Sequence, residues 1–113
     1  MHITKDNIGE FIYGSLMDCS DKGITRLEYI PDGIRHLYCE YNQLTELPKL
    51  PESLISLYCR NNQLTELPIL PESLISLYCG GNQLPYIVTI DNLKQHNKLI
   101  KRKQILEKIR LYH

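Results

Sequence analysis

Apolar residues recur along the chain at a fixed interval of 20 positions. Each interval carries two apolar residues separated by one residue, as at Leu57 and Cys59, and further leucines at wider spacing. Residues two apart lie on one side of an extended strand, whereas the wider spacing suits turns that enter the same core. The pattern predicts one short strand per interval, joined by coils whose apolar side chains point inward.

The repeat is nearly identical in the middle of the chain. Residues 42–59 (NQLTELPKLPESLISLYC) and 62–79 (NQLTELPILPESLISLYC) differ at one position, Lys49 against Ile69. Residues 14–33 keep the same apolar register in degenerate form. An active site rarely needs a copy of itself, whereas an array that buries its apolar faces against neighbouring repeats needs one. The sequence therefore predicts a solenoid with a degenerate first repeat.

One repeat matches a known consensus. Leu54, Leu57, Cys59, Asn62 and Leu64 follow L-x-x-L-x-L-x-x-N-x-L, with cysteine in the third leucine slot. The paired prolines of each LPxLPES stretch favour an extended, polyproline-like convex side without helices. This short form resembles the leucine-rich repeats of bacterial type III effectors and of giant-virus repeat proteins. The resemblance implies an α/β solenoid with short parallel strands on its concave face.

The asparagine slot of the repeat is filled three times, by Asn42, Asn62 and Asn82. In leucine-rich repeats such an asparagine turns inward and bonds backbone groups that would otherwise be buried without a partner. The resemblance therefore implies a buried ladder of amide side chains that runs along the stacked repeats and holds their turns together.

A solenoid exposes its core at each end unless something covers it. Within residues 1–13 a capping residue precedes apolar positions at helical spacing, which predicts a short amphipathic helical cap. These positions are Asp6 or Asn7 for the cap and Ile8, Phe11 and Ile12 for the apolar side. The repeats proper then occupy residues 34–90.

Residues 91–113 predict a longer amphipathic helix that caps the last repeat and completes a single domain, 1–113. Asp91 or Asn92 would cap its N-terminus. Its apolar side would consist of Leu93, His96, Leu99, Ile100, Leu106 and Ile109.

Charge is divided unevenly along the chain. The chain has 13 basic and 13 acidic residues, but residues 1–90 carry 6 and 11 of them, net −5, and residues 91–113 carry 7 and 2, net +5. This supports an alternative to protein binding, in which the basic helix binds nucleic acid or an anionic membrane surface and the repeats are a scaffold. The cations involved would be Lys94, Lys98, Lys101 and Arg102.

Four cysteines share one position of the repeat: Cys19, Cys39, Cys59 and Cys79. Zinc thiolate sites use C-x2–4-C spacing to converge on one point, whereas a 20-residue interval spreads the sulfurs along a line. We predict buried, reduced core thiols that bind no metal and no cofactor. The alternatives are a disulfide between adjacent repeats, a metal site with His36 as a further ligand, and a thiol enzyme with an exposed, reactive cysteine.

The residues between the inward positions face outward on the concave sheet. Candidate partner-binding residues there are Tyr38, Tyr58 and Tyr78 in one row, Tyr41 beside them, and His36, Glu40 and Arg60 in the flanking rows. Tyrosine and arginine are typical of interface hot spots, and an exposed aromatic row is costly to leave in water. We therefore predict a protein partner on this face. The alternative is that the tyrosine row only stabilises the sheet.

The motifs of common catalysts are missing, since the chain contains no G-x-x-x-x-G-K-[ST], G-x-S-x-G or H-E-x-x-H. We therefore expect a non-catalytic interaction module. No apolar run approaches the roughly 18 residues of a membrane span, and Lys5, Asp6 and Glu10 interrupt the region where a signal peptide is apolar. The expected location is intracellular and cytoplasmic, and the resemblance to effectors extends it to a host cytoplasm.

Overall fold

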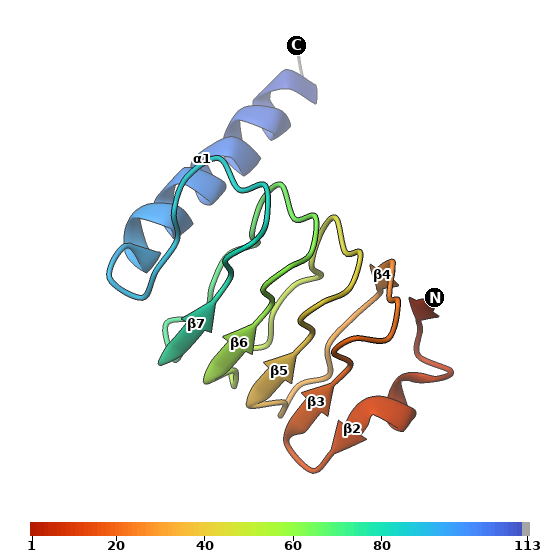
Figure 1. The fold of residues 1–113 in the computed structure, drawn as a ribbon. Coiled ribbons are helices and arrows are strands. Elements are labelled where there is room, and N and C mark those ends of the chain that lie inside the picture. The colour runs from red at the N-terminus through yellow and green to blue at the C-terminus, as the bar shows by residue number, and fades with distance from the viewer. Residues whose placement is uncertain (112–113) are drawn as a thin grey trace.

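The computed structural model describes residues 1–111, which form an α/β fold with one long helix at the C-terminal end (Figure 1). The elements in chain order are β1 (His2–Ile3), the 3-10 turn η1 (Ile8–Phe11), β2 (Ile12–Tyr13), β3 (Leu16–Asp18), β4 (Arg26–Leu27), β5 (His36–Tyr38), β6 (Ser56–Tyr58), β7 (Ser76–Tyr78) and α1 (Leu93–Leu111). The last positions of the predicted C-terminal helix, 112–113, lie outside the described residues.

Five strands form one sheet in the order β2-β3-β5-β6-β7, visible as a row in Figure 1. The last four pair in parallel, with Met17, Leu37, Leu57 and Leu77 opposite one another. Since these partners are 20 residues apart, the strand of each 20-residue turn of the chain, here called a coil, stacks on the strand of the next. The predicted parallel strands at a fixed interval are confirmed.

The inward side chains form a continuous core along the stack. Cys19, Cys39 and Cys59 are 0% exposed, as are the leucines two positions before them in β5 and β6. All four cysteines are free, and Cys79 in the last coil is only partly buried. The predicted inward placement is therefore confirmed for the first three thiols and holds in part for the fourth.

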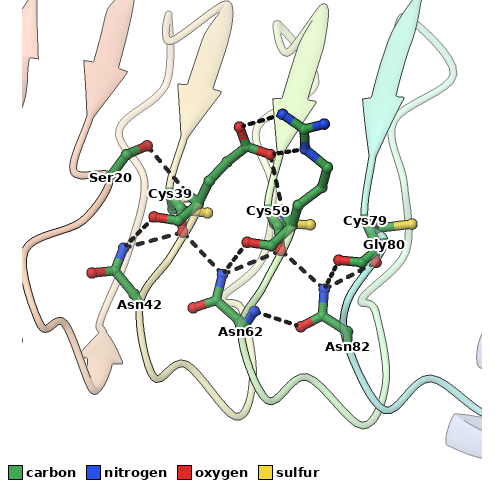
Figure 2. Close-up of polar contacts among 10 residues, drawn as sticks. Ser20, Cys39, Asn42, Cys59, Asn62, Cys79, Gly80 and Asn82 are labelled. Atoms are coloured by element: carbon green, nitrogen blue, oxygen red, sulfur yellow. Dashed lines mark hydrogen bonds and ion pairs between the residues drawn. The ribbon is translucent and has the colours of Figure 1, made fainter.

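Inward asparagines brace the turn that follows each strand (Figure 2). The Nδ2 group of Asn62 donates to the carbonyl oxygens of Cys39 and Cys59, at 3.0 and 3.2 Å. Its Oδ1 accepts a hydrogen bond from the Leu44 N–H at 3.1 Å. Each such amide joins its own coil to the preceding one, and Asn42 and Asn82 repeat the arrangement. The expected asparagine ladder is confirmed.

The N-terminal segment differs from the predicted helical cap over residues 1–13. Only one 3-10 turn forms there, and Asn7 at its start makes no side-chain capping bond. Ile12 then enters β2, which pairs antiparallel with β3. Gly14, with φ +65°, turns the chain between the two strands. Strand pairing replaces the second helical turn because β3 would otherwise present an unpaired edge.

A second sheet, which the sequence pattern did not indicate, holds the start of the chain. β1 and β4 pair in parallel, with Ile3 opposite Leu27. Both side chains are buried, and the N-terminal amine donates to the Gly23 carbonyl oxygen at 3.1 Å. Strands of two residues are too short for alternation to be recognised, so this contact becomes visible only in three dimensions.

The first two turns of α1 pack on the body, and the rest of the helix does not. Leu93, His96, Asn97 and Ile100 are buried, whereas every residue from 101 to 111 is exposed. The single apolar side predicted for this helix is therefore wrong in part. The members that stay exposed are Leu99, Leu106 and Ile109, at 45%, 54% and 48%.

Two polar side chains anchor α1. The Asn97 amide pairs with the backbone of Leu70, accepting from its N–H and donating to its C=O at 2.8 Å each. His96 Nε2 lies 2.9 Å from the Pro68 carbonyl oxygen, and Nδ1 lies 2.7 Å from the Tyr86 hydroxyl. A neutral imidazole satisfies both contacts, donating to Pro68 and accepting from Tyr86. These bonds fix the helix to the coils on the side away from the strands.

Candidate interaction surface

The outward side chains of the five-stranded sheet lie in rows, and we call this surface the sheet face. Strand register aligns Leu16 with His36, Ser56 and Ser76, and Asp18 with Tyr38, Tyr58 and Tyr78. A third row follows two positions later, with Ser20, Glu40, Arg60 and Gly80. The structure therefore brings together six of the seven predicted partner-binding residues on adjacent rows.

The tyrosine row is a continuous aromatic surface. The rings of Tyr38 and Tyr58 stack, with centroids 4.7 Å apart and planes at 12°. Tyr78 meets Tyr58 edge-on, at 4.8 Å and 85°. Both arrangements are favourable for aromatic pairs. Tyr78 at the end of the row is 49% exposed, so the row keeps free aromatic area.

Arg60 is held in place beside the tyrosine row. Its Nε donates to Glu40 Oε2, and its Nη2 donates to Oε1 at 3.1 Å, so that the guanidinium forms a fork on the carboxylate. These hydrogen bonds raise the pKa of Arg60 above its ordinary value. The guanidinium carbon lies 5.5 Å from the centroid of the Tyr78 ring, within cation–π range. Glu40 thus orients a cation against the exposed end of the row.

The opposite flank of the tyrosine row is polar and more buried. His36 Nδ1 lies 3.0 Å from Ser56 Oγ, and Ser56 is 7% exposed. Because the two side chains are partners of each other, this flank is less free to bond a ligand than the flank with Arg60.

Tyr41 lies outside the rows, on the turn after Glu40. It is 57% exposed, and its φ of +57° is in the left-handed region. The corresponding positions of the other coils have φ values of 53° at Asp21, 59° at Asn61 and 67° at Gly81. Asp, Asn and Gly are the residue types that tolerate this conformation, and tyrosine is not one of them. A strained residue thus presents an exposed aromatic ring next to the ion pair.

Burial disfavours the thiolate form of the cysteines. Burial raises the pKa of Cys19 to about 12 and raises those of Cys39 and Cys59 further. Burial also raises the pKa of Cys79, whose Sγ donates to the Val88 carbonyl oxygen at 3.3 Å. Within residues 1–111, no group of three His, Cys, Asp or Glu side chains is arranged to hold a metal ion.

Several features of this surface were missed in the sequence. Asp18 continues the tyrosine row, and Arg60 reaches along it to Tyr78. A groove lined in part by Tyr78, Pro85 and Ile87 extends the surface beyond β7. The predicted basic residues, Lys94, Lys98, Lys101 and Arg102, lie on α1, as the sequence indicated. Comparison of the chain with protein-family models and with curated proteins gives no match.

Proposed function

We propose that this protein is a non-catalytic leucine-rich-repeat solenoid that binds a protein partner through the sheet face. The main supporting observation is the aromatic row with an oriented guanidinium at its exposed end. The anchors are Tyr38, Tyr58 and Tyr78, and the residues that tune partner choice are His36, Glu40, Arg60 and Tyr41. This function needs no cofactor.

The arrangement suits binding because the tyrosine and arginine side chains that would contact a partner are already ordered. Tyrosine and arginine dominate interface hot spots, where they fill the centre of a contact and exclude water. Stacking of Tyr38 on Tyr58 and the fork on Glu40 restrict these side chains before a partner arrives. Ordering flexible side chains normally costs about 0.5–1.5 kcal/mol each on association, and preorganisation reduces that cost.

Tyr41 gives independent support. The other coils place Asp, Asn or Gly at this left-handed position, and only one coil places an aromatic residue there. Strain that persists at an exposed position is more often a feature of a functional site than of a scaffold. A contact with a partner would explain a tyrosine at this turn, whereas sheet stability does not.

The test compares partner binding and folding in Tyr58→Ala. A partner is first captured on the immobilised chain, and its affinity is then measured in purified form. We expect the affinity to fall about 30-fold or more, as for a hot spot worth about 2 kcal/mol. The free energy of unfolding should fall by about 0.4–2 kcal/mol, because the change removes two cross-strand pairs worth about 0.2–1 kcal/mol each.

The control is Leu111→Ala, which removes an exposed apolar side chain from α1, outside the sheet face. It should leave the affinity unchanged. If Tyr58→Ala instead lowers stability strongly and leaves partner affinity intact, the tyrosine row serves the sheet alone and the proposal fails.

A further inference from the structure

The second half of α1 is a surface that the fold does not use. Beyond Ile100, which is 4% exposed, the residues 101–111 are all exposed, and we call this segment the arm. It includes Ile105, Leu106 and Ile109, which are 59%, 54% and 48% exposed. In Figure 1 the arm runs past the coils toward the C-terminus. With Leu111, which is 83% exposed, four large apolar side chains are exposed on a free helical segment, and they need an explanation.

Ile105, Leu106 and Ile109 lie on the opposite side of the helix from the side chains that dock it, whereas Leu111 lies on the docking side. An α-helix turns by about 100° per residue, so Ile109 is rotated by about 180° from Ile100. Ile105 and Leu106 lie about 140° and 120° from Ile100 in opposite senses, on either side of Ile109. The arm therefore has an apolar side of its own, and Leu106 and Ile109 on it line a pocket together with Ile100 and Glu66.

Cations border that apolar side on both edges. By the same helical geometry Lys101 and Lys108 flank it next to Ile105, and Lys103 and Arg110 flank it next to Leu106. Arg102 lies within the apolar side, about 200° from Ile100 and so between Ile109 and Leu106. The arm carries these five cations and one anion, Glu107, so its net charge is +4. Lys103 Nζ is 3.8 Å from Glu66 Oε1, but both side chains are about half exposed and such a pair contributes little.

We propose that the arm binds the surface of an anionic lipid bilayer, lying in the interface while the solenoid remains outside. An apolar strip bordered by lysine and arginine is the pattern of an interfacial helix, because long cationic side chains reach back to the headgroups while the strip enters the acyl boundary. No helix within residues 1–111 is long and apolar enough to cross a membrane, so the arm would rest on the surface.

Other occupants fit the arm less well. Nucleic acid would use the cations but would leave the three apolar side chains in water. A second arm would bring two segments of charge +4 together, which is repulsive. The acidic body of a second copy would neutralise the cations but place the apolar strip against charged side chains.

The test is flotation of the purified full chain with vesicles of phosphatidylcholine, alone or mixed with phosphatidylserine. We expect binding to the mixed vesicles and at least tenfold weaker binding to phosphatidylcholine alone. The variant Ile105→Ser, Leu106→Ser, Ile109→Ser should lose at least tenfold in affinity for the mixed vesicles. A tenfold loss corresponds to about 1.4 kcal/mol, and the burial of three aliphatic side chains in the bilayer contributes more than that. Its melting temperature should not change.

The matched control is Ile75→Ser, Ile87→Ser, which removes exposed apolar side chains outside the arm, at 70% and 81% exposure. It should bind the vesicles like the parent. Lack of binding by the parent overturns the proposal, as does unchanged binding of the arm variant, which would leave only charge adsorption. Tighter binding to RNA than to vesicles, or self-association through the arm, would also overturn it.

Discussion

At the residue scale, a backbone requirement recurs with the repeat. Asp21, Tyr41, Asn61 and Gly81 all have positive φ, so the turn after each strand is left-handed whatever residue occupies it. At Gly81 a Cβ would lie 2.3 Å from Asn61 Oδ1, so any larger residue there would require the exposed Asn61 side chain to move. The same turn geometry recurs in all four coils, and the residue type adapts to it or accepts strain.

Tyr41→Asn tests this strain. Asparagine enters the left-handed region more readily than an aromatic residue, so we expect the free energy of unfolding to rise by about 0.5–1 kcal/mol. The measurement is urea denaturation of the variant and the parent. Asn61→Tyr is the reciprocal control and should lower stability by a similar amount. Equal stability of Tyr41→Asn and the parent would show that the turn is unstrained.

At the element scale, α1 consists of a docked half and an exposed half. Its first two turns place a polar pair, His96 and Asn97, against backbone groups of the coils. If the repeats continued, the next coil would supply the hydrogen-bond partners of these backbone groups. The side chains of its remaining turns are all exposed and do not join the body's core. The helix is therefore a cap as far as Ile100 and a free arm beyond it.

Changes in the two halves of α1 should differ in their effect on stability. Asn97→Ala leaves the buried N–H and C=O of Leu70 without partners, so we expect a loss of about 1–3 kcal/mol in the free energy of unfolding. Deletion of residues 101–113 removes the exposed arm and should change stability by less than about 0.5 kcal/mol. Thermal and urea unfolding of both variants measure this. Aggregation of the truncated chain alone would assign the arm to the cap.

At the scale of the whole molecule, burial of one thiol per coil makes stability depend on alkaline pH. The ordinary thiol pKa is 9.0, and burial raises the pKa of Cys19 to about 12, with Cys39 and Cys59 higher still. Above about pH 9 the unfolded chain therefore binds fewer protons than the folded chain, and stability falls as pH rises. The contribution is fully present below pH 9.

We expect each of these three thiols to cost about 1.4 kcal/mol per pH unit above pH 9. Urea midpoints measured between about pH 8 and pH 10.5 should fall steeply. Cys39→Ala should be less stable than the parent at every pH. Its free energy of unfolding should nevertheless fall less steeply with pH, by about 1.4 kcal/mol per pH unit, because one buried thiol is missing. An unchanged slope would mean that the thiols titrate alike in both states. A thiol reagent should label the native chain mainly at Cys79, which is the least buried.

The sequence by itself determined the periodic part of this protein. The interval of 20 residues specified the parallel strands, the inward cysteines and asparagines, and the tyrosine row, because identical coils that stack must align identical side chains. It also located a helix near residue 93 from a capping region followed by helical spacing. These features depend on local pattern, which one chain carries in full.

Only the tertiary structure decided what happens where the repetition ends. At the N-terminus β2 pairs with the otherwise open edge of β3, and a single 3-10 turn forms where a helix was predicted. At the C-terminus the body is long enough to receive only the first two turns of α1, so Leu106 and Ile109 stayed in solvent although their spacing resembles that of a core. Residues such as Asp18 and Arg60 joined the tyrosine row through contacts between different coils. Edges, packing partners and the reach of side chains are properties of the assembled chain, and local spacing does not contain them.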